Sequence, residues 1–342
     1  MQSASAATAT MVATALAGTR VVFAGERGII LYSDDAAHVW HQSAVPVSVT
    51  LTALYFVNSS SGWAVGHDGV ILHSADGGET WVKQADGNRL NELLRINAEA
   101  RLEHAKTALQ GAPDDPALQR EIEQAQFGLD DVNAGAQFGP SRPLLGVWFA
   151  SDIAGYVVGS NGQIFATADG GVHWVSLSQQ FNNPDALHYN SINGNKSGQQ
   201  VIAGEAGKVY ISAADGSWKT FDVGYNGALY GVLQLRHDNQ DVLLGYGFGG
   251  HIFRSVDQGA SWVQVGADAK APTLVAGIVR DNGEIVLLGQ DASLLRSVDG
   301  GQHFQRTEAS PGLRVASLVE LPHGAVLTAG IAGAHLIALD VK

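Results

Sequence analysis

The stretch Ser74–Trp81, SADGGETW, decides the fold of this chain. Its pattern, S-x-D-x-G-x-x-W, occurs six times, about every 42 residues, and a repeat of this length with four short strands per unit is typical of a β-propeller. Three further copies are intact and two are degraded, one by loss of its glycine and one by a missing residue. The intact copies are Thr167–Trp174, Ser255–Trp262 and Ser297–Phe304, and the degraded ones are Ser33–Trp40 and Asp215–Trp218.

The aspartate and the final aromatic residue of each copy have a structural explanation. The carboxylate can accept backbone N–H groups within its own turn, and the large ring can be buried between neighbouring sheets. An active site needs one copy of a group and not six, so a catalytic role for these aspartates is disfavoured. The set is Asp35, Asp76, Asp169, Asp215, Asp257 and Asp299, with Trp40, Trp81, Trp174, Trp218, Trp262 and Phe304.

A second repeated element, G-x-x-G, predicts the turn between the second and third strands of each unit. Glycine favours the left-handed backbone of two-residue hairpin turns and lets neighbouring backbones approach closely. Seven such turns are present, one of them the variant Gly289/Ala292, and they predict seven blades in one all-β domain over residues 1–342. The last unit, Leu313–Lys342, has only three strands, and residues 2–8 are expected to supply its outer strand and close the ring. Six blades is the alternative if that unit is only a cap.

The spacing is interrupted between Trp81 and Trp174, where about 87–141 changes character. Apolar residues at helical spacing predict two helices, the first capped by Asn88 and stopped by Gly111, and the second begun by Asp115 and Pro116. The short loop between them predicts an antiparallel hairpin between blades 2 and 3. Its position places it on the face that carries the G-x-x-G turns, where it either leans over that face or projects from it. It acts as a partner-docking arm or lid, or it packs only on itself.

Composition excludes several classes of protein. The net charge of −13 disfavours non-specific binding to nucleic acid or to anionic membranes. The absence of cysteine excludes disulfides and thiol chemistry. No apolar run approaches the roughly 18–20 residues that a membrane span needs, so we expect no direct membrane insertion. The Ser- and Ala-rich start resembles the beginning of a mature exported protein, which predicts a periplasmic or otherwise exported location.

Two stretches carry a family resemblance, Leu51–Trp81 and Leu145–Trp174. Both resemble the repeat of the photosystem II stability/assembly factor-like family, which are BNR/Asp-box propellers, and the resemblance covers the chain outside about 87–141. It implies a non-enzymatic protein-binding module with no cofactor. It also implies a protein partner, a membrane complex or, for a bacterial member, an RND-type transporter. Photosynthetic members carry an arginine-rich patch, whereas this chain is acidic, so we expect a bacterial non-photosynthetic member.

Candidate partner-binding residues lie on the predicted turn face and on the hairpin. Arginine and aromatic residues contribute most to interface energy, and polar turn tips surround them. The candidates are Arg27, His67, Asp68, Asn161, Glu205, Arg142, Arg314, Leu94, Leu102, Phe138 and Tyr225.

The alternative function is a sialidase-like glycoside hydrolase or a carbohydrate-binding propeller that uses the funnel of the same face. Sialidase chemistry requires three converging arginines, for which Arg27, Arg142 and Arg314 are the candidates, beside paired acidic and tyrosine residues such as Glu26, Glu205 and Tyr230. The F/Y-R-I-P signature of sialidases is missing. Arg142 either points into the funnel or pairs with Asp131. No histidine spacing indicates a metal site.

Overall fold

The computed structural model describes residues 6–195, 197–266, 272–307, 312–322, 324–331 and 333–337. These residues form seven antiparallel sheets, each a simple meander along the chain. The first is β1 (Met11–Ala17), β2 (Arg20–Gly25), β3 (Ile30–Ser33) and β4 (His41–Gln42). The second is β5 (Leu51–Phe56), β6 (Gly62–Gly66), β7 (Ile71–Ser74) and β8 (Val82–Ala85). The third is β9 (Leu144–Phe149), β10 (Gly155–Gly159), β11 (Ile164–Thr167) and β12 (Val175–Ser176).

The remaining sheets repeat this arrangement, and each sheet forms one blade, numbered along the chain. The fourth is β13 (Tyr189–Gly194), β14 (Gln200–Gly204), β15 (Lys208–Ser212) and β16 (Trp218–Asp222). The fifth is β17 (Leu229–His237), β18 (Gln240–Gly247), β19 (Ile252–Ser255) and β20 (Val263–Val265). The sixth is β21 (Leu274–Val279), β22 (Ile285–Gly289), β23 (Leu294–Ser297) and β24 (Gln305–Arg306). The seventh has three described strands, β25 (Val315–Glu320), β26 (Val326–Gly330) and β27 (Gly333–Ile337).

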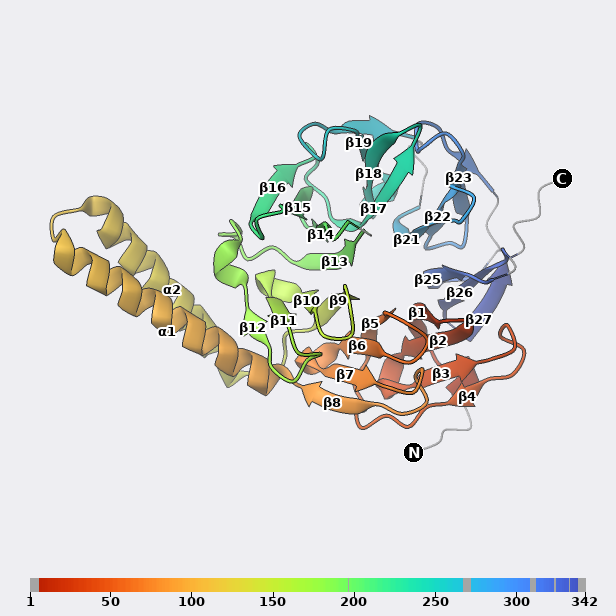
Figure 1. Cartoon of the computed structure of the whole chain (residues 1–342), viewed down its shortest axis with the longest axis horizontal. Coiled ribbons are helices and arrows are strands. Elements are labelled where there is room, and N and C mark those ends of the chain that lie inside the picture. Colours follow the sequence, from red (N-terminus) through yellow and green to blue (C-terminus); the bar gives the residue numbers. More distant parts are fainter. Residues whose placement is uncertain are drawn as a thin grey trace.

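The first strand of each sheet faces the centre of a closed ring (Figure 1). Each of these inner strands contacts the inner strand of the next sheet, and β25 contacts β1, so the ring closes between the two ends of the chain. The predicted all-β propeller is therefore confirmed.

Every inner strand has an irregular register at its second residue, a β-bulge. A bulge bends a strand and turns the extra side chain away from the regular pleat. Two of the extra residues bond to the next blade: Thr52 Oγ1 donates to the Leu144 carbonyl at 2.6 Å, and Asn190 Nδ2 donates to the Leu229 carbonyl at 2.9 Å. The residues at this position are Val12, Thr52, Leu145, Asn190, Tyr230, Val275 and Ala316.

The core lies between neighbouring sheets. Trp63 on β6 stacks on Phe149 of β9 with ring centroids 3.4 Å apart, and Trp174 meets the edge of Phe149 at 6.2 Å. Because all three rings are buried, blades 2 and 3 share one apolar layer. The same arrangement recurs around the ring as seven separate apolar clusters among the described residues.

The repeated aspartates lie in tight loops that lead to the outer strands. Asp169 accepts the backbone N–H of His173 at 2.9 Å and the Thr167 hydroxyl at 2.9 Å, and Asp257 accepts the N–H of Ser261 at 2.9 Å. The Trp81 indole donates to the Gly78 carbonyl at 3.0 Å, which fixes the ring against its own loop. The Asp215 loop is reduced, since its carboxylate bonds only Ser217. These contacts agree with the structural role inferred for the motif.

The N-terminal segment differs from the prediction. Of the expected outer strand over residues 2–8, residues 2–5 lie outside the described part, and Ala6–Thr8 forms a 3-10 turn instead of a strand. Ala6 and Ala9 nevertheless pack in one buried cluster with Leu327 of β26, so the segment covers the seventh blade without pairing to it as a described strand. Small alanine side chains explain this close packing, because they cost little entropy to bury.

Two long helices interrupt the propeller between β8 and β9. Helix α1 spans Gly87–Gly111 and α2 spans Pro116–Gln137, and they lie side by side along their length. Asp115 caps α2 as predicted, accepting the Ala117 N–H at 2.8 Å. The predicted cap of α1 was wrong, because Asp86 and not Asn88 holds the extended backbone and accepts the Arg89 N–H at 3.3 Å.

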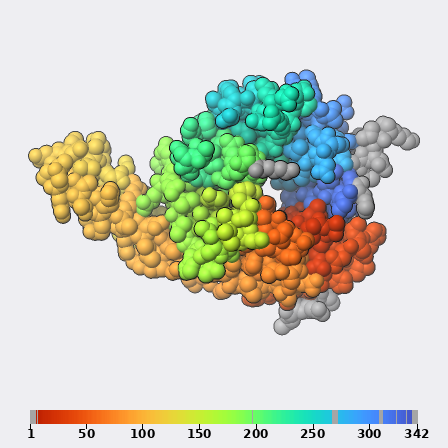
Figure 2. Space-filling view, viewed as in Figure 1, coloured from red at the N-terminus to blue at the C-terminus, as the bar shows by residue number. Residues whose placement is uncertain are grey.

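The hairpin projects outward from the rim of the ring, well beyond the sheets (Figure 1), and the space-filling view shows it as a separate arm (Figure 2). Its base contacts the turn η3 (His67–Gly69), so it begins at the predicted face. Of the two arrangements left open by the sequence, the structure shows projection from the ring. The cause is local: α1 packs along the outer strand β12 of blade 3, which directs the helix away from the centre.

Candidate functional site

The turns between the second and third strands gather on one face of the ring, here called the turn face. Each was expected to be a two-residue turn, but in blades 1, 2, 3 and 5 it is a three-residue 3-10 turn whose last two residues lie in the left-handed region. In blade 1 these are Arg27, with φ 56°, and Gly28, with φ 67°. The first residue of the loop is tied to its own blade, since the Glu26 N–H donates to the Thr10 carbonyl at 3.0 Å. The loop tip is therefore a rigid exposed position that presents whatever side chain it carries.

Arg27, Asp68 and Asn161 occupy equivalent tips on blades 1, 2 and 3, with φ of 56°, 57° and 55°. All three are exposed, as is His67 beside Asp68. The structure thus places four of the predicted residues on one face, spread over three neighbouring blades.

Asn161 approaches a polar group on blade 4. The Asn161 backbone N–H donates to His188 Nδ1 at 3.4 Å. This His188 nitrogen also lies 3.3 Å from the Glu205 carboxylate. Glu205 also accepts the backbone N–H of His188 at 2.9 Å. Asn161 and Glu205 were predicted, but His188 was missed. It stands immediately before an inner strand, outside both repeated motifs, and only the equivalent position of Thr10 in blade 1 could have indicated it.

An aromatic group lies further around the same face. Tyr225 packs against His251 with centroids 4.5 Å apart, and its hydroxyl donates to the Phe248 carbonyl at 3.0 Å. Phe248 itself is exposed. Burial raises the pKa of the Tyr225 hydroxyl, so it stays a hydrogen-bond donor at neutral pH. Tyr225 was predicted as a contact residue, and the structure adds His251 and Phe248 to it.

The three candidate arginines come from three parts of the molecule: the base of the hairpin, blade 1 and blade 7. Arg142 pairs with Asp131 of α2 at 3.2 Å, which decides between its two predicted roles. Arg27 lies on the blade 1 tip, and Arg314 is exposed just before β25 in blade 7.

The hairpin is anchored to blade 3 by polar contacts from α1. Asn97 Nδ2 donates to the Ser176 carbonyl at 3.1 Å, and Gln179 Nε2 donates to the Asn97 carbonyl at 2.7 Å. The predicted contact residues Leu94 and Leu102 are buried, at 8% and 5% exposure, and Leu94 packs in the core cluster of blades 2 and 3, so neither is exposed on the hairpin surface.

Two phenylalanines are exposed on the hairpin instead. Phe127 is 75% exposed on α2, and the predicted contact residue Phe138, which follows the helix, is 81% exposed. Exposed rings of this size are uncommon on a surface that contacts only water, and aromatic residues are enriched at protein interfaces.

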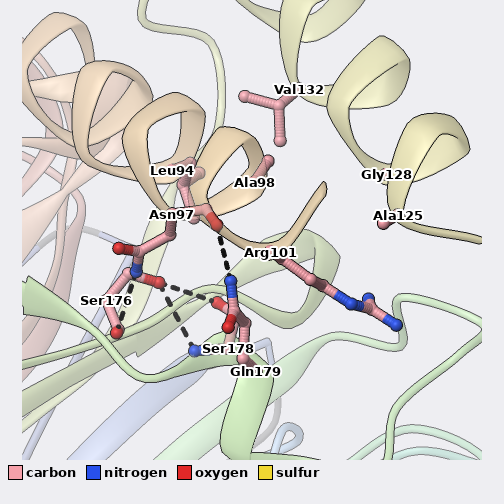
Figure 3. A pocket seen from close by; sticks show the side chains of 10 residues that line it. All are labelled: Leu94, Asn97, Ala98, Arg101, Ala125, Gly128, Val132, Ser176, Ser178 and Gln179. Carbon is pink, nitrogen blue, oxygen red and sulfur yellow. Dashed lines mark hydrogen bonds between the residues drawn. The ribbon is translucent and has the colours of Figure 1, made fainter. Parts of the chain in front are cut away.

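A cavity of ≈ 160 Å³ lies between the hairpin and blade 3 (Figure 3). Leu94, Ala98 and Val132 line it from the two helices. Ser176, Ser178 and Gln179 line it from the propeller. No motif in the sequence predicts this cavity, because its walls come from segments about 80 residues apart (Asn97 and Gln179, for example).

The match to known proteins follows the repeat. The model of the family "Photosynthesis system II assembly factor YCF48" matches residues 12–106, which include the first two blades and most of α1. The predicted family resemblance is confirmed over this part of the chain. No curated protein matches the chain.

Solved structures of the YCF48 family share the fold. One, described as YCF48 bound to D1 peptide, is 16% identical, with a TM-score of 0.65, and the match covers 98% of this chain and 95% of that one. YCF48 from Cyanidioschyzon merolae is 14% identical, with a TM-score of 0.64 and coverage of 96% and 95%. A streptogramin B lyase is similarly close, at 12% identity and a TM-score of 0.66, covering 97% of this chain and 94% of its own. At these identities the likeness establishes the propeller fold.

Among the described residues, no group of three or more histidine, aspartate or glutamate side chains is placed to hold a metal ion. In the same part of the chain, neither helix is both long and apolar enough to span a membrane.

Proposed function

We propose that this chain is a non-enzymatic protein-binding module that assists the assembly of a membrane protein complex. It holds its partner with the turn face and the helical hairpin of a seven-bladed propeller. The match to the YCF48 family model and the peptide-bound relative of the same fold support a protein as the ligand. That relative has a peptide bound. For the present chain we infer from it only the class of ligand, a protein segment.

The observation that carries the proposal is the hairpin. Closure of the ring does not need it, because β5, the inner strand of blade 2, contacts β9 directly. It is nevertheless fixed to blade 3 by hydrogen bonds and exposes two aromatic side chains, Phe127 on α2 and Phe138 at its base. A rigid arm of this kind suits docking, since little conformational entropy is lost when a pre-organised surface binds.

The proposed location is the periplasm, and the proposed partner is an exported part of a membrane complex, of which an RND-type transporter is our first candidate. Both follow from the family resemblance of the repeat. The acidic chain favours a partner surface with basic groups, because complementary charge steers association.

The test is an affinity pull-down from the native cell envelope. The intact chain is compared with a variant in which residues 88–139 are replaced by a short glycine linker. Such a linker can close the gap, because a Cβ on Gly87 would lie 2.7 Å from the Cα of Pro140. We expect a membrane protein to be retained by the intact chain and lost by the deletion.

Thermal unfolding of the deletion variant serves as the control for an intact ring. Equal retention by both chains would move the contact to the turn face. A well-folded intact chain that retains no envelope protein would contradict the proposed function.

A second candidate, carbohydrate binding, rests on the Tyr225, Phe248 and His251 group. Sugar rings stack on aromatic faces, and the 3.0 Å contact of Gln264 Nε2 with His251 Nδ1 holds the imidazole ring in place beside them. A glycan array screened with the intact chain and with Tyr225→Ala distinguishes the two functions. Glycan signals that disappear in the variant would favour this candidate over a protein partner.

A further inference from the structure

Two pairs of neighbouring blades are joined on the turn face by a hydrogen bond from a loop tip to the next blade. In blade 5, the Gly249 N–H donates to Thr273 Oγ1 at 3.3 Å, and Thr273 immediately precedes β21, the inner strand of blade 6. In blade 3, the Asn161 N–H donates to His188 Nδ1 at 3.4 Å, and His188 immediately precedes β13, the inner strand of blade 4. The two bonds therefore join equivalent positions of the repeat through different acceptors.

The two acceptors respond differently to pH. A threonine hydroxyl keeps its lone pairs throughout the range in which proteins are folded, whereas an imidazole nitrogen accepts a hydrogen bond only while it carries no proton. Histidine is also the side chain whose charge ordinarily changes between about pH 5 and pH 8. The other six blades have no histidine at this position and hold Thr10, Thr50, Pro143, Ala228, Thr273 and Arg314.

The same nitrogen of His188 has a second partner that requires the opposite protonation state. Glu205 Oε2 lies 3.3 Å from His188 Nδ1. A carboxylate only accepts hydrogen bonds, so this contact needs a proton on Nδ1, whereas the Asn161 N–H needs a lone pair on the same atom. One nitrogen cannot meet both requirements at once, and the two bonds therefore exclude each other.

The backbone holds both partners beside the ring whichever bond is formed. Glu205 Oε2 accepts the backbone N–H of His188 at 2.9 Å, and the Glu205 N–H donates to the His188 carbonyl at 3.2 Å. On the other side, the blade 3 loop packs against the segment before His188, because a Cβ on Gly162 would lie 2.8 Å from Asn183 Nδ2. A change of bond at the ring therefore needs no movement of either loop.

Few charged groups face the His188 ring. Among the described residues, Glu205 is the carboxylate at ion-pair distance from it. The blade 3 loop Ser160–Gly162 has no charged side chain, and the segment that leads into β13 contributes one, the exposed Asp185. Lys208, which follows the blade 4 turn, is paired with a carboxylate of β16 at 2.6 Å. The choice between the two bonds therefore depends on the proton at Nδ1 and on Glu205.

We propose that His188 is a pH-dependent switch in the turn face. In its neutral form the ring carries its proton on Nε2, and Nδ1 accepts the Asn161 N–H, which links blade 3 to blade 4. When Nδ1 takes up a proton, the cationic ring donates to Glu205 Oε2 and the Asn161 N–H is released. The blade 3 tip then presents a free backbone donor beside a neutralised carboxylate. This inference does not depend on the proposed function.

The test is NMR spectroscopy of the full chain from about pH 8 to about pH 5, the range in which histidine ordinarily titrates. Long-range proton–nitrogen spectra of the imidazole show which ring nitrogen holds the proton at the upper end, and we expect Nε2 of His188. As the pH falls, the Asn161 amide signal and the His188 ring signals should move together with one midpoint. The Gly249 amide is the internal control, because its threonine acceptor does not titrate.

A matched pair of variants assigns the effect to the ring. His188→Thr gives blade 4 the acceptor that blade 6 has at the equivalent position. The pH-dependent displacement of the Asn161 amide signal should fall at least tenfold in this variant. His67→Thr, which removes another exposed histidine of the turn face, is the control and should leave that displacement unchanged.

A proton on His188 Nδ1 in the neutral ring would overturn the inference. An Asn161 amide signal that does not move with the ring would do the same. Both are observed in the wild-type chain, so they decide the matter whether or not the variant folds. An equal displacement of the Asn161 amide signal in folded His188→Thr would also reject the switch, because the effect would then come from another group.

Discussion

The aspartates of the repeated loops act on stability through hydrogen bonds that only the ionised carboxylate accepts. The backbone N–H and the ring of His173 hold the pKa of Asp169 at about 2, well below its usual 3.8. The Ser261 hydroxyl and N–H do the same for Asp257, whose pKa is also about 2. A carboxylate with a lowered folded-state pKa stabilises the fold above its unfolded pKa, and that contribution is lost as pH falls through the folded value.

We predict that Asp169→Asn is less stable than the wild type at pH 6 and that the difference shrinks between about pH 4 and pH 2. Thermal unfolding measured across this range checks it. Asp114→Asn, on the exposed loop between the helices, is the control and should follow the wild type. A difference that stays constant down to pH 2 would show that the ionised carboxylate is not the stabilising group.

A buried ion-pair group joins blades 6 and 7. The Glu284 side chain is 5% exposed and lies 2.6 Å from Arg280 and 2.5 Å from Arg296, while Arg280 also reaches Glu320 at 2.9 Å. We predict that Glu284→Gln lowers the free energy of unfolding by roughly 3 kcal/mol, because two poorly solvated guanidinium groups lose their shared carboxylate. Denaturant unfolding measures the loss. Glu320→Gln, at a more exposed position, should cost clearly less, and an equal cost for both would contradict this account.

The helices show how far local patterns determine an element. The stripe of leucine and alanine predicted both helices and their antiparallel pairing, and Asp115 with Pro116 predicted the start of the second. The start of the first was misplaced because Asp86 and Asn88 are both good caps, and the choice depends on where β8 ends. The direction of the arm was not predictable, since it is set by contacts with β12 of the following blade.

Gly128 provides a test at this scale. We predict that Gly128→Ala raises the free energy of unfolding by about 1 kcal/mol or less, because alanine favours the helix and its Cβ meets no neighbour. Chemical denaturation, followed by helical circular dichroism, measures it.

Gly25→Ala is the matched opposite, since a Cβ there would lie 2.0 Å from the Thr10 carbonyl oxygen. That variant should be destabilised. If Gly128→Ala were also destabilised, the space beside α2 would not be open in solution.

At the scale of the whole molecule, the repeat predicted the architecture but not the way its ends meet. The spacing of the Asp motif and of the G-x-x-G turns was enough to predict the propeller, because each copy recurs in the same place in its sheet. Of the outer strand expected from residues 2–8, the described part, Ala6–Thr8, forms a 3-10 turn, and Ala6 packs in the cluster of the seventh blade. The site was harder to predict: His188 and the hairpin cavity depend on contacts between blades, which no single repeat encodes.

Ring closure should be sensitive to the packing of the N-terminal segment. We predict that Ala9→Asp lowers the melting temperature by several degrees, because it places a charge in the apolar cluster with Leu321 and Leu327. Differential scanning calorimetry measures the change. Ala134→Asp, at an exposed position of α2, is the control and should leave the melting temperature nearly unchanged. Equal stability of Ala9→Asp would mean that this segment is not needed to close the ring.

The two ends of the hairpin leave the ring at almost the same point, where Gly87 and Pro140 touch. Because the two attachment residues are neighbours, the propeller needs only to join them. The length of the inserted hairpin can therefore change without altering the geometry of the ring. Each additional turn in both helices would move the tip outward by about 5.4 Å. The insertion can therefore act as a molecular ruler, in which a change of a few residues adjusts the reach of the arm while the seven sheets keep their packing.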